Sequence, residues 1–219
     1  SLKERYSDNQ IRNLVSSNKY RICDLIFRQL MRHRTMKATN LREEISNISF
    51  EIMKPIFNSE QILNAYELEY ECPQGMDIKS VVYKGGTKWL TEFFKFDSNS
   101  ERQLALACEN DPKVLRWLRP TSDQFDITYS FEGMTHNYEP DMVIETEDCC
   151  YLVEVKRRSE LNDSQVLAKT ERGVQYCKLA SEYCSKNGYK TWKYLLIPHD
   201  EITETTSFDK FATYFCKSN

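Results

Sequence analysis

Two carboxylates and one lysine in this sequence have the residue types that metal-assisted hydrolysis requires: Asp141, Glu154 and Lys156. Carboxylate oxygens are the ligands that Mg²⁺ prefers in proteins. A neighbouring ammonium can position an attacking water or stabilise negative charge on a phosphate. Neither Cys nor His accompanies the acids at ligand spacing, so Mg²⁺ or Mn²⁺ suits this set better than zinc. Phosphodiester hydrolysis needs little beyond such a set.

The sequence around these residues predicts a β-hairpin. Two β-rich runs, Pro140 to Glu145 and Cys149 to Lys156, are separated by a short polar segment, as expected for two strands and a tight turn. If the turn is centred on residues 147 and 148, the numbers of facing residues sum to 295, which places Asp141 across from Glu154. Opposed side chains on an antiparallel pair lie about 5 Å apart, so like charges repel there. A bound cation would offset that repulsion.

Strand periodicity adds Lys156 to the same face, because it follows Glu154 by two residues. Two other interpretations are open. The acids can be exposed strand residues and the lysine a solvated strand end. A one-residue bulge would also break the register on which the pairing of Asp141 with Glu154 depends.

The remainder of the second half reads as an α/β domain. Because an apolar strand follows a long helix after the hairpin, residues 149–156 and 192–197 are predicted to form a βαβ unit with parallel strands. The predicted elements are, in order, a strand at Val81-Val82-Tyr83, a helix from Ser98 to Asn110, a short helical piece over Val114 to Leu118, a strand from Phe125 to Phe131, the hairpin, a helix from Asn162 to Asn187, a strand from Trp192 to Ile197, and a helix carrying Phe208, Phe211 and Phe215.

The N-terminal third has a different character. Apolar residues at helical spacing predict helices over Asn18 to His33 and over Asn40 to Phe57. Residues 1–37 hold nine basic and three acidic residues, a net of +6 that leaves −9 for the rest of a chain whose total is −3. This basic segment is either a phosphate-binding surface or an ordinary solvated helix face. We therefore predict a helical N-terminal region, 1–75, followed by a catalytic domain, 76–219.

Composition places the chain among ordinary globular proteins. Its 219 residues are 40 % hydrophobic and 29 % charged, with only six glycines and six prolines. No apolar run approaches the length of a membrane span, and the first ten residues do not resemble a signal peptide. We expect a cytoplasmic protein. The eight cysteines show no C-x2-C pair, so we expect small apolar core residues in a reducing compartment instead of disulfides or a zinc site.

A longer pattern around the acids resembles a known nuclease family. Pro140-Asp141, twelve residues and then Glu154-Val155-Lys156 resembles the signature of the PD-(D/E)xK, or restriction-endonuclease-like, nucleases. The context resembles the C-terminal nuclease domain of type III restriction subunits and related helicase-nucleases over roughly residues 80–205. The segments that carry this likeness are Phe96-Asp97-Ser98 with Glu101, Val114 to Pro120, Tyr138 to Asp141, Tyr151 to Lys156, and Trp192 to His199.

The resemblance implies a fold and a set of site residues. It implies a mixed central sheet with flanking helices and a Mg²⁺-dependent DNA endonuclease in which Asp141, Glu154 and Lys156 are catalytic. The further positions that it suggests are Glu101 as a third acid, Glu101 and Val155 as metal-ligand positions beside Asp141 and Glu154, Gln175 as a supporting glutamine, and Arg157, Arg158 and Lys169 as DNA contacts. Four of these positions have a plainer alternative. Glu101 in Ser98-x-x-Glu101 also fits a helix capping box, and Gln175 and the two arginines also fit an exposed surface.

The resemblance also implies partners. We expect double-stranded DNA as the substrate, in restriction or anti-phage defence, with no membrane involved. Because no G-x-x-x-x-G-K-[ST] loop occurs in the sequence, we expect the motor to come from a helicase or ATPase domain or subunit outside this chain. The alternative function is a non-catalytic module of the same fold that binds nucleic acid or a partner. The presence of all three central residues favours the enzyme.

Overall fold

The computed structural model describes residues 5–32, 45, 56–121, 124–125 and 127–217. Its contacts divide the chain into two compact units. One comprises residues 1–42 with 130–136, and the other comprises residues 43–129 with 137–219. Strand β1 (Tyr66–Glu67) pairs in parallel with β2 (Tyr83–Lys84) within the second unit. That pairing spans the boundary that the sequence suggests between residues 75 and 76.

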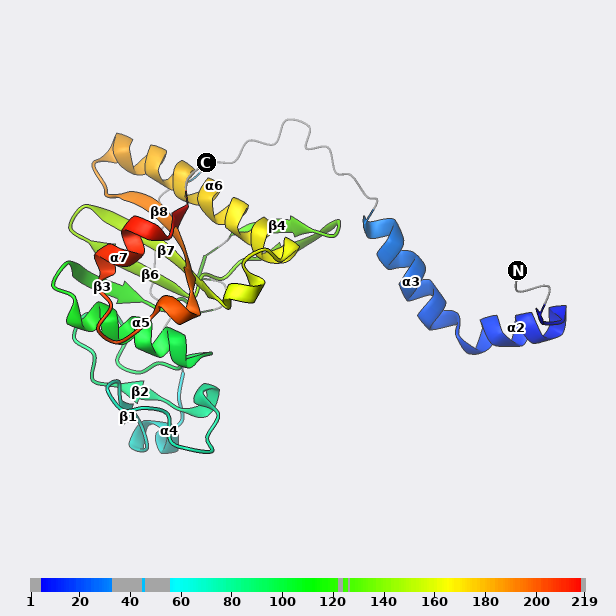
Figure 1. Cartoon of the computed structure of the whole chain (residues 1–219), viewed down its shortest axis with the longest axis horizontal. Helices are drawn as coiled ribbons and strands as arrows, with labels where there is room; N and C mark the ends of the chain where they lie inside the picture. Colours follow the sequence, from blue (N-terminus) through cyan, green and yellow to red (C-terminus); the bar gives the residue numbers. More distant parts are fainter. Residues whose placement is uncertain (1–4, 33–44, 46–55, 122–123, 126, 218–219) are drawn as a thin grey trace. The chain divides into compact units, whose positions relative to one another are not determined.

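In the described residues of the first unit, helix α2 (Asp8–Ser17) precedes helix α3 (Lys19–Arg32) (Figure 1). Ser7 begins α2 with a capping box, because its hydroxyl accepts from the Gln10 N–H and the Gln10 side chain accepts from the Ser7 N–H. Helix α3 matches the helix predicted over Asn18 to His33. No residue of either helix is buried. The helix predicted over Asn40 to Phe57 lies outside the described residues, apart from 45, 56 and 57.

The second unit is built on a mixed five-stranded sheet in the order β3-β6-β7-β8-β9. The central pair, β7 with β8, is parallel, and the other neighbours are antiparallel. The chain is thus a mixed α/β protein, and the predicted βαβ unit is confirmed. The bounds of the elements in and around the sheet are α5 (Asn99–Asn110), β3 (Val114–Leu118), β6 (Met142–Thr146), β7 (Cys149–Lys156), α6 (Ser164–Asn187), β8 (Thr191–Pro198), α7 (Phe208–Tyr214) and β9 (Cys216–Lys217).

The hairpin has the register predicted from its turn. Met142 pairs with Val153 and Glu145 with Cys150, so the facing residue numbers sum to 295 along the ladder. The ladder ends at Met142, one residue after Asp141. Register is fixed here because a slip of one residue would turn every buried side chain of these strands to the opposite face.

Alternation along β7 divides its side chains between two layers. Tyr151 and Val153 face the apolar core that α5 and α7 share, whereas Leu152 and Glu154 face the side of α6. In Figure 1, α6 runs along one side of the sheet and α5 along the other. Gly173 lets α6 approach β8, since a Cβ at that position would lie 2.3 Å from the ring of Tyr194.

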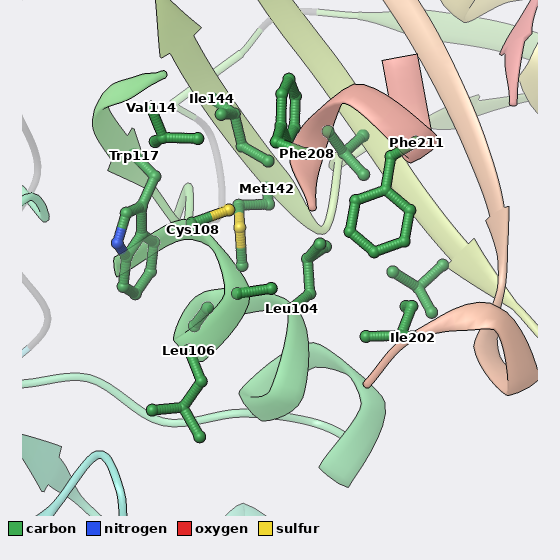
Figure 2. Close-up of a cluster of buried hydrophobic side chains, with 14 of the residues drawn as sticks. Leu104, Leu106, Cys108, Val114, Trp117, Met142, Ile144, Ile202, Phe208 and Phe211 are labelled. Carbon is green, nitrogen blue, oxygen red and sulfur yellow. The ribbon is translucent and has the colours of Figure 1, made fainter. Parts of the chain in front are cut away.

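The core on the α5 side is a continuous apolar cluster. Figure 2 shows Leu104 and Cys108 of α5 packed with Met142 and Ile144 of β6 and with Phe208 and Phe211 of α7. Ser98 caps α5 as predicted, accepting from the Glu101 N–H. The packing of α5 against β6 fixes the start of one element relative to the start of the other. The acidic residues lie at these two starts.

One predicted element is wrong and another is confirmed only in part. Val114 to Leu118 forms strand β3 instead of a helical piece, because its backbone pairs with β6, and this tertiary pairing overrides the local helical spacing. The strand predicted over Val81 to Tyr83 begins only at Tyr83, because Val81 is the C-cap of a short 3₁₀ helix that ends at Ser80. The other elements in the described ranges are α4 (Ser59–Leu63), η1 (Ile78–Ser80), β4 (Thr128–Phe131), β5 (Met134–Asn137), η2 (Arg158–Glu160) and η3 (His199–Glu201).

The cysteines follow the core prediction only in part. Cys108, Cys149 and Cys177 are buried, whereas Cys23 is exposed on α3. All eight are free thiols. None of the helices in the described ranges combines the length and apolar composition that a bilayer-spanning segment requires.

Candidate functional site

The predicted acids and lysine meet where β7 ends beside the start of β6. Asp141 lies just before β6, and its N–H donates to the Val153 carbonyl at 3.0 Å. Its side-chain Oδ2 accepts from the Val155 N–H at 2.7 Å. Two hydrogen bonds to the β7 backbone therefore hold Asp141 against the strand that carries Glu154 and Lys156.

Glu154 is the most deeply buried member of the site, with 1 % of its surface exposed. Its Oε1 lies 2.7 Å from the Lys156 Nζ and 3.9 Å from the Lys169 Nζ. The other oxygen, Oε2, is buried and has no hydrogen-bond partner among the described residues. Burial, with the charge of Asp141 adding to it, raises the pKa of Glu154 to about 7. A buried carboxylate oxygen without a partner is energetically unfavourable unless a ligand satisfies it.

The ammonium of Lys156 lies among the oxygen atoms of the site. Besides Glu154 it contacts the Val155 carbonyl at 3.2 Å and Asp141 Oδ2 at 4.0 Å. Burial acts to lower the pKa of Lys156, but Asp141 and Glu154 outweigh that effect and the pKa is raised. Lys156 is therefore a charged counterion that offsets the repulsion between the two acids.

Glu101 approaches the site from the first turn of α5. Its Oε1 accepts from the Ser98 hydroxyl at 3.0 Å and its Oε2 from the Asp97 N–H at 3.1 Å. Burial and then the charge of Asp141 raise the pKa of Glu101. The cap with Ser98 is thus present, and the carboxylate also lies within electrostatic reach of Asp141. Both interpretations of Glu101 have a structural basis.

Arg119 is a site residue that the sequence does not single out. Its guanidinium lies 3.5 Å from Glu101 Oε2 and also contacts Asp97 and the Lys95 carbonyl. The available signal was its position directly after the apolar strand β3, which ends at the same edge as the acids. Arg119 pairs with the Glu101 carboxylate, as Lys156 pairs with Glu154.

Lys169 projects from α6 toward the same face. Besides its contact with Glu154, its ammonium lies 5.9 Å from the ring centre of Tyr129 and 5.8 Å from that of Tyr138. Cation–π attraction to both rings favours this position of the ammonium. Behind it, the Tyr138 hydroxyl donates to the Tyr194 hydroxyl at 3.3 Å. Lys169 thus adds a second positive charge near Glu154 Oε1.

The other predicted residues lie farther from this centre or are otherwise engaged. Gln175 is exposed and lines a hollow on α6 with Glu171, Lys178 and Glu182. Arg158 donates to Asp200 at 2.7 Å and to Glu201 at 2.6 Å, which joins η2 to η3. Arg157 is exposed at the end of β7.

The donor set fits a hard divalent cation. The carboxylates of Asp141 and Glu154 and the carbonyl of Val155 are oxygen donors, and Mg²⁺ is commonly held by one or two carboxylates with water and phosphate completing the shell. The partnerless Oε2 of Glu154 supplies an unsatisfied acceptor at this place. Within the described ranges, no group of three or more His, Cys, Asp or Glu side chains is arranged to hold a metal ion. A cation here would therefore rely on two acids.

The chain matches no protein-family model and no curated protein sequence. The structure defines a mixed α/β protein in which two acids and a lysine meet where the inner strand β7 ends beside the start of β6.

Proposed function

We propose that this protein is a Mg²⁺- or Mn²⁺-dependent DNA endonuclease with a restriction-endonuclease-like core. The observation that carries the proposal is the meeting of Asp141, Glu154 and Lys156 where β6 begins and β7 ends. One buried oxygen of Glu154 also has no partner in the described part of the chain. A structural ion pair does not require an unsatisfied carboxylate oxygen, whereas a cation site uses one.

The residues have separate roles in this proposal. Asp141, Glu154 and the Val155 carbonyl would hold the cation, which supplies acidification of a water molecule and neutralisation of a phosphate oxygen. Lys156 orients the attacking water or stabilises the charge that develops on the phosphate. Glu101, held by Ser98 and Arg119, contributes negative potential beside Asp141.

The basic residues around the edge suit a phosphate backbone. Lys169 and Arg157 are the side chains that we assign to DNA contacts, because Arg158 is engaged with Asp200 and Glu201. Gln175 is exposed on α6, so we keep it only as a secondary candidate for a glutamine that supports the catalytic site. We propose double-stranded DNA as the substrate and a type III-like restriction or anti-phage helicase-nuclease as the system, with the motor in a partner domain or subunit.

A plasmid-cleavage assay tests this function. The chain alone is incubated with supercoiled plasmid at low and physiological salt, with Mg²⁺, with Mn²⁺ or with EDTA. We expect slow, metal-dependent and sequence-independent nicking that is strongest at low salt, because phosphate contacts dominate weak DNA binding. Fusion to a translocating helicase should increase the rate by raising the local DNA concentration. Failure to cut under every condition, with intact fold and DNA binding, would favour the alternative below.

The alternative is a non-catalytic module of the same fold that binds nucleic acid or a partner. It is favoured by the arrangement of Glu101, whose two oxygens are already bonded to Ser98 and Asp97, and by the lack of a three-residue metal-binding group within the described ranges. Fluorescence anisotropy with a labelled duplex separates the two. The module should bind equally in Mg²⁺ and in EDTA, whereas the enzyme should bind more tightly when the cation is present.

A further inference from the structure

The site contains a cation of its own, the ammonium of Lys156. It contacts Glu154 Oε1 at 2.7 Å and the Val155 carbonyl at 3.2 Å, and it lies 4.0 Å from Asp141 Oδ2. These three groups are the ones that the proposed function assigns to the divalent cation. Mg²⁺ binds oxygen at about 2.1 Å, so a cation shared by these three groups would overlap the ammonium that already contacts the Val155 carbonyl and lies beside both carboxylates.

Resting on the proposed function, we propose that Lys156 is a built-in competitor of the divalent cation, and that DNA removes this competition. A phosphate of the bound DNA gives the ammonium a new partner and draws it off the oxygen donors. Cation and DNA therefore bind cooperatively, and by linkage each increases the affinity of the other by the same factor.

The two lysines of the site differ in what would let them move. Their side chains are about equally exposed, 23 % for Lys156 and 25 % for Lys169. The flexible four-carbon stem of Lys156 lets its ammonium turn toward an incoming phosphate while Glu154 stays in place. Lys169 is held over the rings of Tyr129 and Tyr138 and remains 3.9 Å from Glu154. Both place a positive charge near the same oxygen, but only Lys156 also contacts the Val155 carbonyl.

This difference provides a matched control. General electrostatic repulsion of the divalent cation would make removal of either lysine charge increase metal affinity to a similar extent. Occupation of the ligand positions predicts a much larger effect for Lys156. The variants Lys156→Gln and Lys169→Gln keep a polar side chain and remove one charge each, and Lys156→Ala serves as a second variant at the competing position.

The experiment measures Mn²⁺ binding from the electron paramagnetic resonance signal of free Mn²⁺, with the whole chain as wild type and as each variant. A short duplex with phosphorothioate linkages keeps the negative charge and resists hydrolysis. Without DNA, Lys156→Gln and Lys156→Ala should bind Mn²⁺ about tenfold more tightly than the wild type, and Lys169→Gln within about threefold of it. The duplex should tighten Mn²⁺ binding by the wild type about tenfold and by the Lys156 variants little.

Each contrary outcome has a distinct meaning. If Mn²⁺ binds the wild type and the Lys156 variants, checked for an intact fold by circular dichroism, gain no more than Lys169→Gln, the competition is refuted while the nuclease site stands. If the duplex tightens binding equally in all proteins, the coupling through Lys156 is refuted. If no protein binds Mn²⁺ with or without the duplex, the nuclease proposal itself fails, and this inference with it.

Discussion

Two glutamates of the same hairpin, Glu145 and Glu154, each lie near two basic side chains, but their pKa values shift in opposite directions. Glu145, near the turn, lies 3.1 Å from Arg116 and 2.7 Å from Lys190. Burial is the largest single influence and acts to raise its pKa, but the hydrogen bonds and charges of Lys190 and Arg116 together outweigh burial and the pKa is lowered. Burial raises the pKa of Glu154 to about 7 in spite of its own two lysines.

The difference shows that counting ion pairs does not identify a functional acid. At the partly exposed Glu145, solvent has already stabilised the charge and the cations add to it. At Glu154, burial and the charge of Asp141 raise the pKa by more than Lys156 and Lys169 lower it. Its Oε2 also has no hydrogen-bond partner among the described residues. The first glutamate is a satisfied structural ion pair. The second holds an unfavourable charge that a ligand would stabilise.

The largest expected effect is on plasmid cleavage, and it should separate the lysine beside Glu154 from the lysine beside Glu145. Lys156→Ala should reduce plasmid cleavage by about 10²- to 10³-fold, because it removes charge stabilisation at the phosphate. Lys190→Ala removes an equal charge at the turn end and should change the rate by less than about twofold. Initial nicking rates at saturating Mg²⁺, with melting temperatures of both variants, provide the measurement. Robust cleavage by Lys156→Ala would contradict the proposed role.

The next effect concerns Glu101. Like Glu145 it pairs with an arginine, and like Glu154 its pKa is raised by burial. Glu101→Gln keeps an acceptor for the Ser98 cap but removes the negative charge beside Asp141. We expect cleavage to fall by about ten- to a hundredfold, with the melting temperature changed by less than about 3 °C. Cleavage rates and thermal unfolding of the same preparations decide the matter. A clear loss of stability with normal cleavage would make Glu101 a helix cap and nothing more.

The contrast between the glutamates also separates the features that the sequence predicts from those that it does not. Periodicity and the turn predicted the register that brings Asp141 toward Glu154, and the apolar run at 192–197 predicted the parallel neighbour of β7. Those features are local, because a two-residue repeat and a short turn determine them. The roles of the counterions were not predictable in this way.

Two cations of the site illustrate why. Lys156 was predicted on the correct face, but its position among the oxygen donors depends on a rotamer that no spacing encodes. Arg119 reaches Glu101 because β3 is a strand, and that segment was predicted to be helical. Contacts between elements distant in sequence depend on tertiary packing, which a single sequence specifies only through the whole fold.

A smaller effect is the pH dependence of stability. Because the folded pKa of Glu154 is raised to about 7 from a usual value of 4.5, the folded state binds the extra proton and the free energy of unfolding falls as pH rises between these values. In EDTA, Glu154→Gln should be more stable than the wild type at pH 8 by up to about 3 kcal/mol, and the gain should shrink toward pH 5. Urea unfolding at both pH values measures it. A variant less stable than the wild type at pH 8 would contradict the unfavourable charge.

The smallest effect is at the other glutamate, and it has the opposite sign. The pKa of Glu145 is lowered, so its pairing contributes stability at neutral pH that is lost as pH falls through the folded pKa. Glu145→Gln should therefore destabilise the protein at pH 8 by no more than about 1 kcal/mol, since water screens a partly exposed pair. The loss should diminish in about 1 M salt, because Arg116 and Lys190 are themselves partly exposed. Urea unfolding at pH 8 in low and high salt tests this, with Glu154→Gln measured beside it. If both substitutions shift stability in the same direction, burial is not what separates the two ends of the hairpin, and the assignment of Glu154 as the functional acid loses its electrostatic basis.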